Sequence, residues 1–92
     1  MIQNTSIISY LNILEELGER QKQCLIALKK IQPANNLMIA NYLHLPINCV
    51  TGRIYELRKK KLVRLDCIKS CPITNQATRF YSIVSYVSEV MA

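Results

Sequence analysis

The spacing of apolar residues predicts helices over the first two thirds of the chain. Residues 5–17 repeat apolar side chains at steps of three and four, which is typical of one face of an amphipathic helix. Gly18 interrupts this pattern, which resumes in the following residues until Pro33 ends it. A short helix of about two turns is then expected after Asn35, which is a suitable N-cap.

The next predicted helix, residues 48–60, separates its two faces most clearly. Val50, Ile54 and Leu57 fall on one side of a helical wheel and are expected to face the core. Pro46 lies near the start of this helix, and Asn48 is the expected N-cap. The opposite, outward side carries Asn48, Gly52, Tyr55 and Lys59.

After Lys60 the pattern becomes typical of strands. β-Branched and aromatic residues flank the turn-forming stretch PITNQA, which predicts two antiparallel strands of about residues 62–68 and 78–85. The expected fold class is α+β, mainly α, with residues 1–92 as a single domain. Its predicted parts are an N-terminal helix (5–17), a helical core (19–60), a β-hairpin (62–85) and a tail (86–92).

Charge narrows the classes of partner. Twelve lysines and arginines against six acidic residues give a net charge of +6, which favours binding to nucleic acid or to an acidic membrane surface. We expect a cytoplasmic, nucleoid-associated protein, because no apolar run is long enough to span a bilayer and the first residues do not resemble a signal peptide.

The order of these elements resembles a winged helix-turn-helix, and the chain is most similar to small winged-helix proteins of phages and prophages. The resemblance covers roughly residues 5–81 and implies a role in DNA binding. Its motifs are Thr5-Ser6, Arg20-Gln21, Ile39-Ala40 to Leu43, Leu45 to Asn48, Val50-Thr51-Gly52-Arg53, Leu57 to Leu62 and Cys71-Pro72-Ile73-Thr74.

The chain departs from this family at its turns. His44 and Lys61 stand where such proteins commonly have glycine with positive φ, at a cost of about 1 kcal/mol each. At the tip of the wing, as the β-hairpin is called in this family, Asn75 and Gln76 replace glycine and arginine. Asparagine tolerates a left-handed turn, so the hairpin is retained, but the missing cation weakens phosphate contact at the tip.

The outward face of helix 48–60 carries the residues expected to contact DNA. Small and polar side chains suit base edges in the major groove, whereas cations hold the phosphates. Gly52 has two interpretations. Its missing side chain would let the helix backbone approach DNA closely, or the glycine has no role in binding. Arg53 would contact guanine or pair with Glu56. The candidate residues are Asn48, Thr51, Gly52, Arg53, Tyr55, Arg58, Lys59 and Lys60, with Lys69 and Arg79 on a solvent face of the hairpin.

Other chemistry has little support in the sequence. Cys67 and Cys71 have the spacing of half a zinc site, but no second close pair completes it, so we expect no metal and no cofactor. Cys24 is expected to be a core residue. No pairing of carboxylates and no histidine partner suggests catalysis, so we expect no catalytic residue and no enzyme.

The expected function is binding of double-stranded DNA in transcriptional regulation, with helix 48–60 in the major groove and the 66–80 hairpin beside the backbone or the minor groove. A homodimer is expected from Ile8, Ile13 and the apolar stretch Ile83 to Met91, although these residues would equally serve to cover the core. The alternative is a protein-interaction adaptor, because winged helices also serve that purpose.

Overall fold

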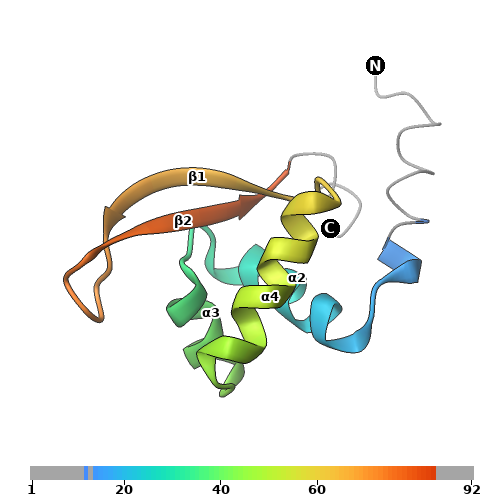
Figure 1. The fold of residues 1–92 in the computed structure, drawn as a ribbon, viewed down its shortest axis with the longest axis horizontal. Coiled ribbons are helices and arrows are strands. Elements are labelled where there is room, and N and C mark those ends of the chain that lie inside the picture. The colour runs from blue at the N-terminus through green and yellow to red at the C-terminus, as the bar shows by residue number, and fades with distance from the viewer. Residues whose placement is uncertain (1–11, 13, 85–92) are drawn as a thin grey trace.

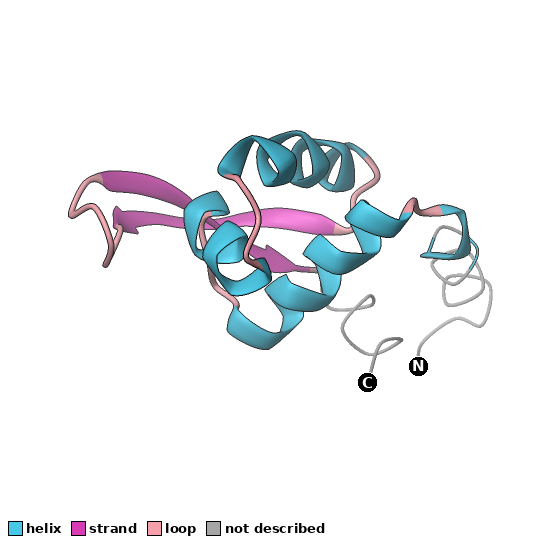
Figure 2. Ribbon diagram, turned by 90° about the horizontal axis from the view of Figure 1, so that it is seen from below, coloured by secondary structure: helices cyan, strands magenta, loops and turns pink. Residues whose placement is uncertain are grey.

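The computed structural model describes residue 12 and residues 14–84. In this part of the chain, helices α2 (Glu19–Ile31), α3 (Asn36–Leu43) and α4 (Ile47–Lys59) precede strands β1 (Val63–Ser70) and β2 (Ala77–Ile83). The strands form an antiparallel hairpin whose closing turn extends well beyond the packed helices (Figures 1 and 2). The predicted α+β winged-helix fold is therefore confirmed.

The predicted N-terminal helix can be followed only in part. Residues 14–16 are helical, and the break expected at Gly18 begins one residue earlier, at Leu17. The rest of segment 5–17 and the tail 86–92 lie outside the described residues, as do Ile8 and Ile13. Ile83 is buried in the core, so this residue does not offer the dimer surface that the sequence suggested.

The core is built from the inward faces that the helical periodicity predicts. Each of these side chains is almost completely removed from water, which is the dominant favourable term in folding. Strands β1 and β2 contribute Val63, Tyr81 and Ile83 to the same cluster. The helical members are Cys24, Leu25, Ala27 and Leu28 of α2, Ile39 and Ala40 of α3, and Val50, Ile54 and Leu57 of α4.

The two predicted N-caps have different outcomes. Asn35 caps α3, because its Oδ1 accepts a hydrogen bond from the Met38 N–H at 2.8 Å. The prediction that Asn48 caps α4 was wrong, since the helix begins at Ile47 and Pro46 is the N-cap. The first turn closes instead through the backbone, where the Cys49 N–H donates to the Pro46 carbonyl at 3.0 Å.

The wing is attached to the helices by backbone pairing with the segment between α2 and α3. Ala34 and Tyr81 exchange both of their backbone hydrogen bonds, at 3.0 and 2.8 Å. Next to this pair, the Ile83 N–H donates to Oε1 of Gln32 at 2.8 Å. Ala34 thus acts as a one-residue third strand, which sets the position of β2 against the helices.

A β-bulge between Leu65 and Cys67 changes which residues share a face of the wing. Asp66 is the extra residue, and its Oδ2 accepts a hydrogen bond from the Ser82 hydroxyl at 2.6 Å. Beyond the bulge, Ile68 pairs with Arg79 and Lys69 pairs with Thr78. The expectation of one solvent face for Lys69 and Arg79 was therefore wrong: both are exposed, but on opposite faces of the ribbon.

Among the described residues, three other than glycine adopt the left-handed conformation, as expected at the family's glycine positions and at the wing tip. The φ values are 57° at His44, 63° at Lys61 and 60° at Asn75. After α4, the Lys61 N–H donates to the Arg58 carbonyl and the Leu62 N–H donates to the Leu57 carbonyl. These two bonds form a Schellman motif, which places Lys61 where glycine is strongly preferred.

We predict that Lys61→Gly stabilises the fold by up to about 1 kcal/mol, because glycine removes the Cβ strain of the left-handed conformation. Lys60→Gly is the matched control, since its φ of −79° suits any residue. That variant should lower stability by about 0.5–1 kcal/mol through backbone entropy. Urea unfolding of both variants tests this pair, and a destabilised Lys61→Gly would contradict it.

Candidate nucleic-acid interface

The outward face of α4 presents a short polar surface at the N-terminal half of the helix. Asn48 and Thr51 are exposed, and the Tyr55 side chain is 59% exposed. The Thr51 hydroxyl donates to the Ile47 carbonyl at 3.1 Å, which holds that side chain against its own helix while leaving its oxygen able to accept. The predicted outward positions are thus brought together on one side of α4.

Gly52 lies in the middle of this face and has no packing role in the described structure. A Cβ built at this position would meet nothing within 4 Å. Glycine inside a helix costs about 1 kcal/mol relative to alanine. The fold itself therefore gives no reason for a glycine here, and the backbone of α4 is open to close approach from outside.

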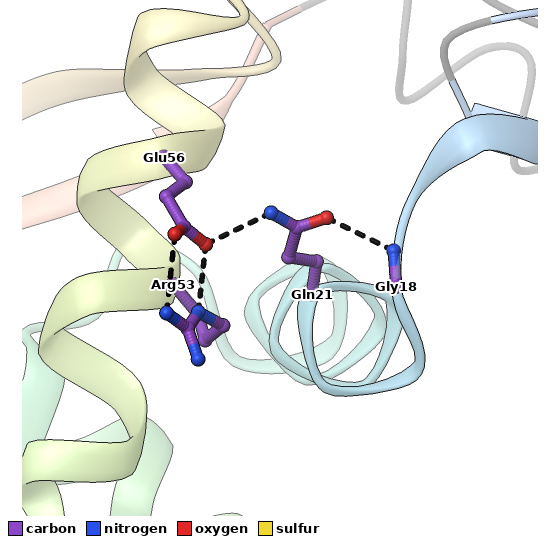
Figure 3. A network of polar contacts seen from close by, with 4 residues as sticks. All are labelled: Gly18, Gln21, Arg53 and Glu56. Atoms are coloured by element: carbon purple, nitrogen blue, oxygen red, sulfur yellow. Dashed lines mark hydrogen bonds and ion pairs between the residues drawn. The ribbon is translucent and has the colours of Figure 1, made fainter.

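Arg53 is held by an ion pair rather than projecting freely. Its Nε and Nη2 atoms donate to the two oxygens of Glu56 at 2.7 and 3.1 Å. Figure 3 shows this pair continuing to α2, where Gln21 donates to Glu56 at 2.8 Å and accepts from the Gly18 N–H at 3.0 Å. Of the two alternatives that the sequence left open, the structure shows the pairing with Glu56.

This network also lowers the pKa of its carboxylate. Hydrogen bonds from Arg53, and then from Gln21, hold the pKa of Glu56 below its ordinary value. The network links α4 to the first turn of α2, since Gln21 lies on α2 and Glu56 on α4. The bidentate pair leaves Nη1 and the second hydrogen of Nη2 able to donate to a base.

Cations gather where α4 meets β1. Arg58, Lys59 and Arg64 line a surface hollow of about 380 Å³ together with Tyr55, Val63 and Leu65. The Lys59 Nζ lies 5.4 Å from the centroid of the Tyr55 ring, and no carboxylate is among the described residues of the lining. This hollow adjoins the outward face of α4 through Tyr55 and Lys59, so polar and cationic side chains form one continuous surface.

Arg64 belongs to this surface although it was not among the residues predicted to contact DNA. Its only ion-pair partner among the described residues is Asp66, with Nη2 and Oδ2 3.5 Å apart. The available signal was its place in β1: Leu62 and Val63 are buried, and Arg64 is the first exposed residue of the strand. The predicted basic surface was confined to residues 48–60 and to Lys69 and Arg79, and the approach of β1 to α4 that adds Arg64 depends on tertiary packing.

The remaining predicted cations are spread more widely. Lys60 is exposed at the C-terminal end of α4. The Lys69 Nζ lies 4.7 Å from the centroid of the Phe80 ring. Arg79 lines a separate hollow of about 380 Å³ that lies between the wing and the first residues of α3 and α4. The structure thus joins the α4 residues into one surface, whereas the two wing cations belong to different faces.

The cysteines in the structure are free thiols in contrasting surroundings. Burial raises the pKa of Cys24 in the core. Cys71 is also buried, but backbone N–H groups of the wing turn, foremost that of Thr74, lower its pKa to about 7. Among residues 12 and 14–84, no three potential ligands lie close enough together to hold a metal ion.

None of the described helices combines the length and the apolar character that a membrane-spanning helix needs.

Comparison with known proteins supports the fold. No family model and no curated protein matches the chain. A cysteine-to-serine mutant of ZitR from Lactococcus lactis has a similar structure, with a TM-score of 0.62 and 20% identity over 82% of this chain and 48% of that one. A glutamate-to-alanine mutant of ZitR gives a TM-score of 0.59 and 18% identity over 98% of this chain and 70% of that one. The chain spans about half the length of the first structure, and the likeness shows the winged-helix fold.

We predict that Cys71 makes stability depend on pH. Its pKa is lowered from 9.0 to about 7 in the folded state, so between these values the unfolded chain binds more protons and stability rises with pH. This contribution is fully present above the unfolded pKa and is lost as the pH falls through the folded one. The free energy of unfolding of the native chain relative to Cys71→Ser should therefore increase from pH 7 to pH 9.

Denaturant unfolding at several pH values measures this difference. Cys67→Ser is the control for loss of a thiol from the same hairpin. An identical pH dependence in the native chain and in Cys71→Ser would contradict the prediction.

Proposed function

We propose that this chain is a double-stranded DNA-binding protein that acts in transcriptional regulation, with α4 in the major groove and the wing beside the DNA backbone or the minor groove. The observation that carries the proposal is the surface of α4, where an unhindered Gly52 lies between polar side chains and a cluster of cations. A phage or prophage origin is part of the proposal and rests on the sequence resemblance.

Gly52 supports close approach of a partner to the helix backbone. The fold gains nothing from the missing side chain, since no atom lies within 4 Å of the position where a Cβ would be. Glycine therefore lowers the stability of the helix by about 1 kcal/mol relative to alanine, and no packing contact compensates for this loss. Docking of α4 in the major groove would explain the glycine, because the absence of a side chain lets the helix lie closer to the base edges.

The cations supply the sequence-independent part of the affinity. Arg58, Lys59 and Arg64 surround one hollow, and Lys60 continues the basic surface at the end of α4. Each phosphate that such groups neutralise releases condensed counterions and makes binding dependent on salt. In this arrangement the N-terminal half of α4 contacts bases through Asn48, Thr51 and Tyr55, and its C-terminal end holds the phosphates.

Arg53 and the wing have secondary roles in the proposal. While Arg53 is paired with Glu56, its Nη1 hydrogens and one Nη2 hydrogen remain to donate to DNA, and the pair holds the guanidinium in one orientation. Lys69 and Arg79 lie on opposite faces of the wing, so at most one of them meets the backbone beside α4. A homodimer with two copies of α4 in successive major grooves stays a prediction that sedimentation tests.

The salt dependence of DNA binding tests the proposal. We expect the native chain to bind mixed-sequence duplex DNA at low salt, with a steep negative slope of log affinity against log salt. Lys59→Ala and Arg64→Ala should each reduce that slope by about one, because each removes a phosphate contact. Fluorescence anisotropy across a salt series measures these slopes.

Lys22→Ala is the matched control, because Lys22 is an exposed cation on α2 that does not line the hollow. It should leave the slope nearly unchanged. Absence of native binding at low salt would contradict the DNA-binding proposal itself, whereas equal slopes for Arg64→Ala and Lys22→Ala would remove only Arg64 from the interface.

Gly52→Ala separates stability from binding. We predict that the free energy of unfolding of the variant is about 1 kcal/mol higher than that of the native chain, because alanine favours the helix. Its affinity for duplex DNA should nevertheless fall by about tenfold, because the added methyl group keeps the backbone away from the groove. Thermal unfolding and anisotropy on one preparation test both effects, and a stabilised variant with native affinity would contradict groove docking at this position.

A further inference from the structure

A second hollow lies between α2 and α3, outside the surface proposed for DNA. It has a volume of about 290 Å³ and lies between the outward side of α2 and the C-terminal end of α3. Ile26 and Tyr42 line it, although these side chains are 49% and 44% exposed. Leu45 contributes further apolar surface, so two of the large hydrophobic side chains most exposed to water meet in one depression.

Cations border this apolar hollow. Arg20 and Lys30 belong to its lining at the two ends of α2, and none of the described residues that line it carries a carboxylate. The two cations are ten positions apart in the sequence, which corresponds to roughly 15 Å along a helix axis. Among residues 12 and 14–84, the Arg20 guanidinium donates only to the uncharged Gln23 on the same helix, at 3.3 Å, and has no carboxylate partner.

We infer that this hollow is a docking site for an acidic amphipathic segment of a partner protein. Apolar side chains of the segment fill the space beside Ile26 and Tyr42, and carboxylates at its two ends pair with Arg20 and Lys30. The distance between these cations fits a helical segment of about ten residues, whose apolar face lies in the groove in the manner of other helix-in-groove complexes. The complementary charges select acidic segments and speed their association.

The site is compatible with DNA bound to α4. On α2 the groove residues Ile26 and Lys30 lie on the side opposite Gln21, the residue that hydrogen-bonds to Glu56 of α4. The groove and the α4 surface share none of their lining residues. The partner segment is therefore expected to leave most of the α4 surface open to duplex DNA, with Arg20 the groove residue that also lines a hollow with Arg53 and Glu56 of α4.

Selection from a peptide library tests the inference. A displayed library of random peptides of about 15 residues is selected on the native chain and depleted on Ile26→Asp. We expect the surviving pool to carry carboxylates on both sides of an apolar stretch. Synthetic peptides from the pool should bind at least ten times more weakly to Ile26→Asp, Tyr42→Ala and Lys30→Glu than to the native chain.

Ile68→Asp is the matched control, because Ile68 is an exposed isoleucine on the wing and lines neither hollow. It should bind the selected peptides as the native chain does. All variants should retain native circular dichroism, since the substituted side chains are exposed. Duplex DNA should not displace the peptides.

Other outcomes would overturn the inference. A pool without acidic residues, an empty pool after depletion, or an equal loss of affinity in Ile68→Asp would each exclude an acidic partner at this groove. Self-association of the native chain that is abolished by Ile26→Asp would instead identify a second copy as the occupant. Failure of DNA binding alone would leave the peptide result unaffected.

Discussion

The exchange of backbone hydrogen bonds between Ala34 and Tyr81 is the contact on which the arrangement of the wing depends. A two-stranded hairpin has little stability by itself in water. Pairing with Ala34 gives β2 a second hydrogen-bonded neighbour. The hydrogen bond from the Ile83 N–H to the Gln32 side chain adds a second contact between β2 and the segment after α2. Tyr81 and Ile83 then pack in the helical core, and Tyr81 also supports Arg58, whose Cζ lies 5.2 Å from the ring centroid. The position of Arg58, a proposed DNA contact, thus depends on the pairing of Tyr81 with Ala34, which lies outside α4.

Much of this fold was accessible from the sequence, because it follows from side-chain periodicity and local backbone preference. The steps of three and four residues placed Val50, Ile54 and Leu57 in the core, and the Asn35 cap and the left-handed turns at His44 and Lys61 appeared where expected. What escaped prediction depends on contacts between distant elements or on one-residue shifts. The bulge at Asp66 changes the alternation of β1 without a proline or glycine to mark it.

The candidate interface was predicted less completely than the fold. The outward side of α4 was anticipated, because one helix carries all its members, but Arg64 joins it only through the approach of β1 to α4. Arg53 shows what helical periodicity does not predict. A helical wheel places this residue near the outward face of α4, but contacts with Glu56 and Gln21 determine where its guanidinium lies. Gln21 is thirty-five positions away from Glu56, a distance that sequence periodicity does not address.

The bulge at Asp66 also makes the wing tolerant of one kind of change other than substitution. Leu65 pairs with Tyr81 and Cys67 with Phe80, so deletion of Asp66 would restore regular alternation and leave the residues between the bulge and the tip on their present faces. Ile68 would still pair with Arg79 and Lys69 with Thr78, whereas the hydrogen bond from Ser82 to Asp66 would be lost. A single-codon deletion at this position thus removes a local distortion of the wing without exchanging its two surfaces.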